Sequence, residues 1–148
     1  MTEDPTTPAN TSTDGGATPE IDVNRLVRER YEKAARLTEE GVMLYPHRFA
    51  PRPGGIAQVR AESEALLASG EEVTLAGRIL IVRSFGKAGF LVVRDGSGEP
   101  GADGRHSGQI QFYVKTGVTD ESGYELYRRG LDAGDIVGAT GRLFVSKT

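Results

Sequence analysis

The chain has 148 residues and a mass of 15.9 kDa, which is enough for one domain of ordinary size with short extensions. It contains no Cys and only two His, so disulfides, thiolate zinc sites, cysteine nucleophiles and His-rich metal sites are excluded. The net charge of −3 reflects the first 24 positions, which hold five of the 21 acidic residues and none of the 18 basic ones, so the remainder is slightly basic.

Residues 1–22 are predicted to form a disordered acidic tail, because their Thr, Pro, Asp, Glu and Gly composition buries too little apolar surface to offset the entropy of ordering. No stretch of the chain approaches the roughly 20 apolar residues of a membrane-spanning helix. The N-terminus also lacks the basic start and apolar run of a secretory signal. We therefore expect a cytoplasmic protein with no membrane partner.

Residues 23–72 are predicted to form a helical N-terminal extension followed by a connector. Apolar residues recur at spacings of three and four over 23–40, which is typical of one helix face, and Gly41 marks the end of the helix. Arg25, Arg28 and Arg36 lie close together on another face. This basic stripe is interpreted equally well as a solvated helix surface or as a contact to an RNA backbone.

A connector and a second helix complete this extension. Pro46 forces Tyr45 into an extended conformation, so residues 44–49 should form a fixed connector with an aromatic residue at each end. A weaker helical pattern follows over 56–67 and ends at Gly70.

Residues 73–148 are predicted to form a β domain, because the apolar period changes from helical to two after residue 72. Strands are predicted at 73–83, 89–94, 109–115 and 135–145, with a short helix around 124–129. Gly77 inside the first strand is typical of a bulge or tight bend.

This order of elements indicates a fold class. A three-stranded meander, a short helix and a further strand are the order of an OB-fold, a Greek-key barrel of five strands whose second and third strands form a nucleic-acid-binding face. Only four strands are predicted here. The fold class is therefore mainly β (α+β), an OB-fold barrel that lacks its fifth strand and leaves an open edge, preceded by one or two helices and the acidic tail.

Two motifs in the sequence resemble catalytic or cofactor-binding patterns, but the neighbouring residues that such sites require are missing. The spacing of Gly96, Gly98 and Gly101 matches the dinucleotide-binding pattern, but a Gly-rich stretch follows where a helix must begin. Ser107 beside His106 could serve as nucleophile and base, yet no third residue positions the pair. No catalytic site is predicted.

A candidate binding face remains on the predicted strands. If Phe90 points outward, it shares its side of the second strand with Val92 and Arg94, while Arg83 closes the first strand and Gln111 projects from the third. An aromatic ring beside a guanidinium and a carboxamide suits an unstacked base, which stacks on the ring and offers its Watson–Crick edge to Arg and Gln. The alternative, which the pattern alone favours, is that Phe90 belongs to the core.

Several stretches of the chain carry a resemblance to a known family. They are Tyr-Pro-His-Arg-Phe at 45–49, Val-Thr-Leu-Ala-Gly-Arg-Ile at 73–79, Arg-Ser-Phe-Gly-Lys-Ala-Gly-Phe at 83–90, Gln-Ile-Gln-Phe-Tyr-Val at 109–114 and Gly-Asp-Ile-Val-Gly at 134–138. With these, residues 25–148 resemble the N-terminal part of class II lysyl-tRNA synthetases, where a helix and a Tyr-Pro-x-Arg-Phe connector precede an OB-fold anticodon-binding domain.

The resemblance implies roles for individual residues. By position, Phe90 matches the family's base-stacking aromatic, while Arg83 and Gln111 match its anticodon-reading residues. Weaker RNA-backbone contacts are expected from Lys87 in the turn and from the arginines of the first helix, Arg25, Arg28 and Arg36. The implied partner is the uracil-rich anticodon loop of lysine tRNA.

The chain also departs from the family. Residues 99–108 look like an extra loop between the second and third strands, and Thr148 falls just before the family's Gly-Glu turn into the fifth strand. That turn carries an acidic residue that also contacts the anticodon, so part of the reading site is expected to be absent.

The family's ATP, Mg²⁺ and lysine sites lie in a later catalytic domain. We therefore expect no cofactor in this chain, which should be a fragment of a longer, homodimeric ATP-dependent ligase and inactive alone. A second hypothesis is a freestanding OB-fold module that binds single-stranded nucleic acid or a protein without catalysis. A third is a purely structural role, in which the open edge pairs with another subunit.

Overall fold

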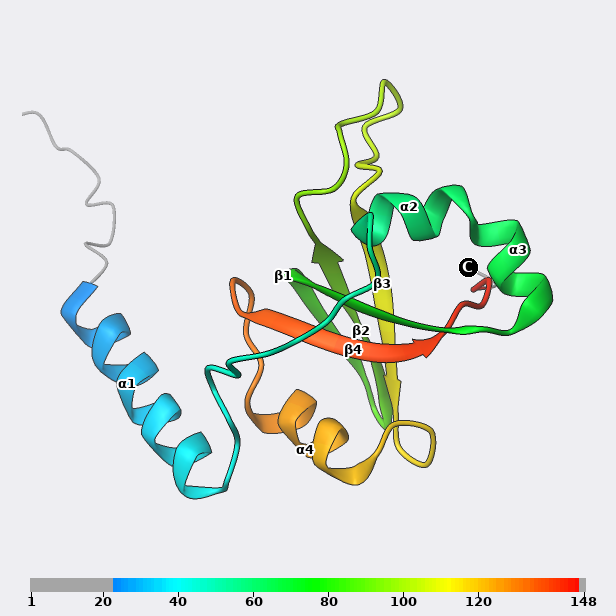
Figure 1. Cartoon of the computed structure of the whole chain (residues 1–148). Helices are drawn as coiled ribbons and strands as arrows, with labels where there is room; N and C mark the ends of the chain where they lie inside the picture. Colours follow the sequence, from blue (N-terminus) through cyan, green and yellow to red (C-terminus); the bar gives the residue numbers. More distant parts are fainter. Residues whose placement is uncertain (1–22, 147–148) are drawn as a thin grey trace, which may run out of the picture.

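The computed structural model describes residues 23–146, so the predicted disordered tail lies outside the described residues. Within this range four helices and four strands follow one another along the chain (Figure 1). They are α1 (Val23–Glu39), α2 (Gly55–Ala61), α3 (Ser63–Ser69), β1 (Glu72–Phe85), β2 (Ala88–Arg94), β3 (Gln109–Lys115), α4 (Glu121–Arg129) and β4 (Ile136–Arg142). The predicted elements are confirmed, and the last strand ends at Arg142, earlier than its predicted end at residue 145.

The four strands form one curled antiparallel sheet in the order β3-β2-β1-β4. Strand β1 is 14 residues long and pairs with both of its neighbours: its first half pairs with β4 and its second half with β2. The meander β1–β2–β3 is followed by α4, after which β4 returns to the free edge of β1 (Figure 1). This half-barrel has the strand order of an OB-fold, as predicted.

The irregularity in β1 lies at a different residue from the one predicted. The register with β2 shifts between Ile79 and Ile81, three residues beyond Gly77. Gly77 is required for another reason, because a Cβ there would lie 2.6 Å from the backbone oxygen of Arg94 and 2.7 Å from the Val93 side chain. The glycine therefore allows β1 and β2 to approach closely, while the bulge itself falls at Leu80.

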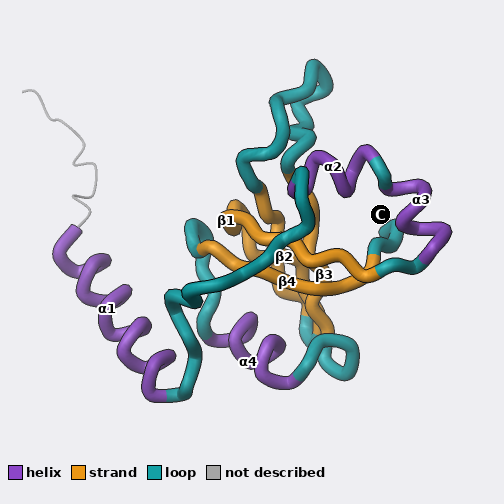
Figure 2. Tube along the Cα trace, in the orientation of Figure 1, coloured by secondary structure: helices purple, strands orange, loops and turns teal. Residues whose placement is uncertain are grey.

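The core lies on the concave side of the sheet, between helices at its two ends. Figure 2 shows α2 and α3 at one end and α4 at the other. The buried core residues are Ile56, Val59, Leu66, Val73, Leu75, Ile79, Leu91, Val93, Val114 and Tyr127. Burial of each Val or Ile side chain stabilises the folded state by about 1.5 to 3 kcal/mol. Because side chains alternate between the two faces of a strand, these apolar residues all lie on the same side of the sheet, which is the side that the helices cover.

The predicted second helix is divided into α2 and α3 at Glu62. The first turn of α2 is capped from a distant segment, since Asp95 Oδ2 accepts a hydrogen bond from the Ile56 amide at 2.8 Å and Ser97 Oγ accepts one from the Ala57 amide at 2.9 Å. These bonds join the β2–β3 loop to α2.

Helix α1 packs beside α4 and the turn that leads into β4. Leu37 is buried there, Lys33 Nζ lies 2.6 Å from Asp132 and 3.0 Å from Asp135, and Arg36 donates a hydrogen bond to a carbonyl of α4. Farther along, the ring of Phe49 in the connector lies against Gly138 of β4, where a Cβ would overlap it. Among the helices of residues 23–146, none has the length and apolar character needed to cross a membrane.

Candidate nucleic-acid interface

The side of β1, β2 and β3 that faces away from the core, here called the outer face, is built from four rows of residues that lie opposite one another on adjacent strands. From one end to the other the rows are Arg78–Arg94–Gln109, Ile81–Val92–Gln111, Arg83–Phe90–Tyr113 and Phe85–Ala88–Lys115. Residues that pair across strands share a face of the sheet. The outer face therefore combines basic, amide and aromatic side chains.

The bulge at Leu80 determines that Arg83 belongs to this face. Arg83 is five positions after Arg78, and in a regular strand an odd difference in position would place the two on opposite sides. Their partners Arg94 and Phe90 are four residues apart on regular β2, so both arginines face the same way. The extra residue in β1 thus brings Arg83 beside the predicted stacking residue.

Phe90 lies near the centre of the outer face and outside the core cluster. Its ring is half-buried because aromatic neighbours surround it. The centroid of Tyr113 lies 5.1 Å away with a 37° angle between planes, and that of Phe85 lies 6.4 Å away at 71°. Of the two interpretations left open by the sequence, the structure places Phe90 on the face and not in the core. Val92, predicted to share this side, does so but is 5% exposed.

Phe85, Phe90, Tyr113 and Phe144 form a continuous line of contacting rings, here called the aromatic row. Phe85 and Phe144 at its ends are 62% and 55% exposed. Of these four rings, only Phe90 was predicted from the sequence to stack on a base. Tyr113 could have been found from the alternation of β3, which places it on the polar side with Gln111. Phe144 follows β4 and reaches Tyr113 through the curl of the sheet, which no local pattern shows.

Arg83 and Gln111 flank Phe90 with polar groups that remain available. Both side chains are exposed, and within residues 23–146 neither makes a hydrogen bond or ion pair with the protein. The backbone of Arg83 is fixed, because its carbonyl accepts a hydrogen bond of 3.2 Å from the Tyr127 hydroxyl of α4. A fixed backbone with an unengaged guanidinium suits a ligand-binding residue.

Lys87 lies in the tight turn between β1 and β2, after Gly86 with a φ of 60°. Its backbone carbonyl accepts a hydrogen bond from the Thr116 amide at 3.1 Å, which joins this turn to the loop after β3. The Lys87 side chain is exposed and has no ion-pair partner in the part of the chain that the structure describes. It lies at the Phe85 end of the outer face.

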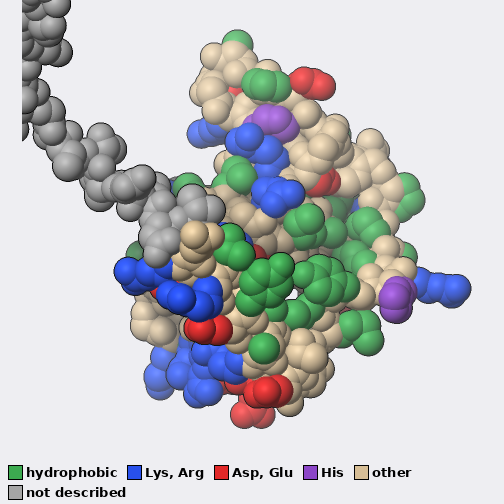
Figure 3. Space-filling model, turned by 90° about the vertical axis from the view of Figure 1, so that its left-hand side faces the viewer, with side chains coloured by type: hydrophobic (Ala, Val, Ile, Leu, Met, Phe, Trp, Pro, Cys, Tyr) green, Lys and Arg blue, Asp and Glu red, His purple; other side chains and the backbone are tan. Residues whose placement is uncertain are grey.

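The three arginines of α1 belong to a helix that packs beside α4 and the turn into β4. Arg25 Nε donates a hydrogen bond of 2.8 Å to the Glu29 carboxylate, and this bond raises the Arg25 pKa above its usual value. Arg36 is engaged with the carbonyl of Arg129 at 3.0 Å, while Arg28 is exposed. Figure 3 shows the side of the molecule on which α1 lies, where Lys and Arg side chains gather to the left of and above a central group of hydrophobic ones, and Asp and Glu side chains lie below it. An RNA contact by these arginines stays a prediction.

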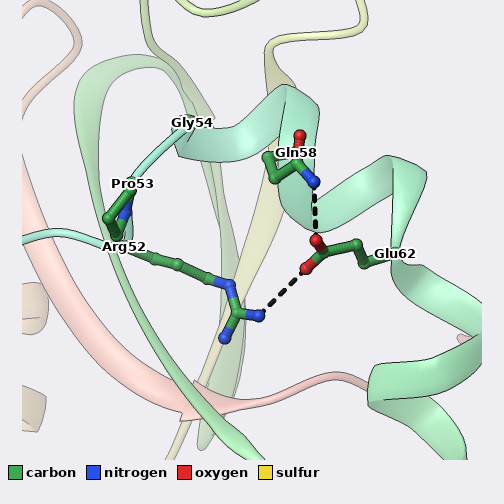
Figure 4. Close-up of a pocket in the computed structure, with 5 residues that line it drawn as sticks. All are labelled: Arg52, Pro53, Gly54, Gln58 and Glu62. Carbon is green, nitrogen blue, oxygen red and sulfur yellow. Dashed lines mark hydrogen bonds and ion pairs between the residues drawn. The ribbon is translucent and has the colours of Figure 1, made fainter.

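A hollow of about 530 Å³ beside α2 is occupied by interactions within the protein (Figure 4). Arg52 pairs with Glu62 at 2.9 Å and with Glu71 at 2.7 Å, and Gln58 donates to Glu62 at 2.6 Å. The hydrogen bonds from Gln58 and Arg52 lower the pKa of Glu62, and those to Glu71 and Glu62 raise the pKa of Arg52. Because its charges are mutually satisfied, this hollow joins the connector to α2 and is not a candidate ligand site.

The loop between β2 and β3 does not form a catalytic site. His106 Nδ1 accepts the Gly108 amide, and the Ser107 hydroxyl is engaged with the backbone of Glu99, so the two side chains do not form a nucleophile–base pair. No helix follows the glycine pattern that begins at Gly96. Among residues 23–146 there is also no group of three or more His, Asp or Glu that could hold a metal ion.

Comparisons with known proteins identify relatives. No protein-family model matches the chain. It is 38% identical over 130 residues to the lysine–tRNA ligase of Paraburkholderia xenovorans, which covers 85% of this chain and 23% of that protein. The lysine–tRNA ligase of Cupriavidus metallidurans is 38% identical over 148 residues, covering 97% of this chain and 26% of that protein. The lysine–tRNA ligase of Cupriavidus necator is 37% identical over 131 residues, covering 86% of this chain and 23% of that protein.

Among solved structures, "OBody AM1L10 bound to hen egg-white lysozyme" matches 71% of this chain and 86% of that chain, at 21% identity and a TM-score of 0.48. The curated relatives are matched over about a quarter of their own length. The chain is therefore homologous to one segment of proteins named lysine–tRNA ligase, and the resemblance noted in the sequence is confirmed at that level.

Proposed function

We propose that this chain is the anticodon-binding segment of a lysine–tRNA ligase and that its outer face binds unstacked bases of the anticodon loop of lysine tRNA. The observation that carries the proposal is the third row of the outer face, where Phe90 stands between Arg83 and Tyr113. A supported aromatic ring next to an exposed guanidinium is suited to hold and read a base.

Each side chain would have a distinct role. A base would stack on the exposed side of the Phe90 ring, since Tyr113 and Phe85 support the ring from its flanks. Uracil presents two carbonyl acceptors and one N–H donor on its Watson–Crick edge. The Arg83 guanidinium can only donate, so it would bind the carbonyls, whereas the Gln111 amide can accept the N–H and donate to a carbonyl.

The remaining parts of the ligase would supply the chemistry. ATP, Mg²⁺ and lysine would be bound by segments of the parent protein that correspond to the rest of its relatives, so this chain contributes recognition of tRNA. Contacts of Lys87, Arg25, Arg28 and Arg36 to the RNA backbone would add a weaker term that is sensitive to salt. This role implies a cytoplasmic location, and the homodimeric state of the parent ligase stays a prediction.

The proposal is tested with a lysine anticodon stem-loop that carries a UUU loop. Phe90→Ala should weaken binding by about 1 to 3 kcal/mol, the usual value of one base–aromatic stack. Tyr45→Ala is a matched control, because Tyr45 is 85% exposed and lies in the connector, away from the outer face. Circular dichroism of both variants checks that they are folded.

Two outcomes would contradict the proposal. Unchanged affinity of folded Phe90→Ala would exclude Phe90 as the stacking residue. Equal affinity of the wild-type chain for a UUU loop and an aspartate-type loop would indicate instead a freestanding OB-fold module that binds single strands without preference.

A further inference from the structure

Arg78 and Arg94 stand directly opposite each other at one end of the outer face, on β1 and β2. Like charges in this position repel and destabilise a sheet. Both side chains are exposed, and within residues 23–146 neither forms an ion pair with a carboxylate. The pair therefore places two uncompensated positive charges side by side on the binding face.

The two guanidinium groups are oriented by neutral acceptors. Arg78 Nη1 donates to the Gly134 carbonyl at 2.7 Å, and Arg94 Nη2 donates to Gln109 Oε1 at 2.9 Å. These bonds fix each group without neutralising it and leave further N–H donors for a ligand. The neighbouring carboxylate of Asp95 is engaged elsewhere, because its oxygens accept hydrogen bonds from Ile56 and Ser97.

A hollow of about 490 Å³ lies at this pair. Arg78 and Arg94 both line it, together with Gly77, Leu80, Asp95, Gly96 and Ile136. At Gly77 the two strands approach closely, since a Cβ there would lie 2.6 Å from the backbone oxygen of Arg94. Its two guanidinium groups outnumber the single carboxylate of Asp95, so the site keeps a net positive charge, which is suited to an anion.

We infer that Arg78 and Arg94 form a phosphodiester-binding site that holds the RNA backbone next to the base-reading residues. The inference rests on the proposed function. Arginine forks bind phosphate oxygens in pairs, and an anion between the two groups would remove the repulsion of the empty site. Arg94 is four residues from Phe90 on the same side of β2, about 13 Å along the strand, so one RNA strand can reach both sites.

The test measures affinity for the lysine anticodon stem-loop over a series of salt concentrations. Arg94→Gln, Arg78→Gln and the double variant should each bind more weakly, and the double variant should lower the slope of log K against log salt by about 0.7 for one lost phosphate contact in a single strand. The loss should be the same for UUU and other loops, because phosphate carries no sequence information. Arg142→Gln is the matched control, since it removes the same charge beside Glu72 at the far end of β1.

A purely structural role for the pair predicts a different result. Removal of one of two repelling charges should leave the melting temperature unchanged or raise it, whereas a structural role would lower it. Arg94→Gln is the cleaner variant, because the bond that it loses is to a side chain and leaves no backbone carbonyl unpaired. A lower melting temperature with an unchanged salt slope would overturn the inference.

Neutral methylphosphonate substitutions in the loop locate the contact. One position should weaken binding to the wild-type chain and have no further effect on the double variant. If no position does so while Phe90→Ala still weakens binding, this inference is overturned and the proposed function stands. If the wild-type chain binds no stem-loop at all, the proposed function itself is overturned.

Discussion

The rings of Phe90 on β2 and Tyr113 on β3 lie opposite each other, with centroids 5.1 Å apart and planes inclined by 37°. Tyr113 is in turn contacted by Phe144 at 5.5 Å, with an angle of 61° between the rings. Phe90 is therefore held by aromatic neighbours and presents its remaining surface outward. An aromatic platform that is fixed before binding loses less entropy when a base stacks on it.

Tyr113→Ala should weaken binding of the lysine anticodon stem-loop, but by less than Phe90→Ala does. The aromatic pair is worth about 0.5 to 1.5 kcal/mol, and its loss would leave Phe90 in place but less well oriented. Tyr113→Phe is the control, since it keeps the ring and removes only the hydroxyl. The measurement is the equilibrium affinity of the three variants side by side. A loss as large as that of Phe90→Ala would instead make Tyr113 a direct stacking residue.

The composition of the candidate site could be predicted in part from local patterns. The alternation of β3 places Gln111 on the polar side, and the resemblance to lysyl-tRNA synthetases marks Phe90 and Arg83. The face on which Arg83 lies could not be predicted from periodicity, because it depends on the bulge at Leu80. The contact between Tyr113 and Phe144 depends on the curl of the sheet, which is a property of all four strands.

The fold shows the same division between local and distant causes. The order of helices and strands follows from period and turn residues, so it was predicted correctly, with differences of up to three residues at the ends of the elements. The break at Glu62 was not predicted, and neither was the capping of the first turn of α2 by Asp95 and Ser97, which lie far along the chain. Gly77, interpreted as a bulge, is instead a point of close approach between β1 and β2.

Gly89→Ala should destabilise the protein by about 1 to 3 kcal/mol, as overpacking of a filled core does. Gly89 faces the core opposite Ser84, and a Cβ there would overlap the Tyr127 hydroxyl and the Arg83 carbonyl, the two groups that are hydrogen-bonded to each other. Urea denaturation measures the change in unfolding free energy. Gly141→Ala is the control, because a Cβ at that position of β4 meets no atom within 4 Å.

A second variant separates the overlap from a general effect of the mutation. Tyr127→Phe removes the hydroxyl, so the double variant Gly89→Ala/Tyr127→Phe should recover part of the lost stability. Equal stability of Gly89→Ala and Gly141→Ala would contradict the close approach of α4 to β2. Because Tyr127 holds the Arg83 carbonyl, Gly89→Ala should also weaken RNA binding.

Asp95 should make the stability of the protein depend on pH in the acid range. Partial burial acts to raise the pKa of Asp95, but the hydrogen bonds from Ser97 and Ile56 outweigh it and hold the pKa below its usual value. The ionised carboxylate therefore favours the folded state. Its contribution is complete above the unfolded pKa of about 3.9 and is lost as the pH falls through the lower folded pKa.

Asp95→Ala should cost about 1 kcal/mol at pH 7 through loss of the cap on α2. The difference from the wild type should shrink below about pH 4, as the wild-type carboxyl takes up its proton and releases the amides. Urea denaturation between pH 3 and 7 measures this difference. Glu99→Gln removes a charge from the same loop without removing a cap. The unfolding free energy of this variant should therefore change with pH in the same way as that of the wild type. A difference that stays constant down to pH 3 would mean that Asp95 acts by packing, because only the charged acceptor is sensitive to protonation.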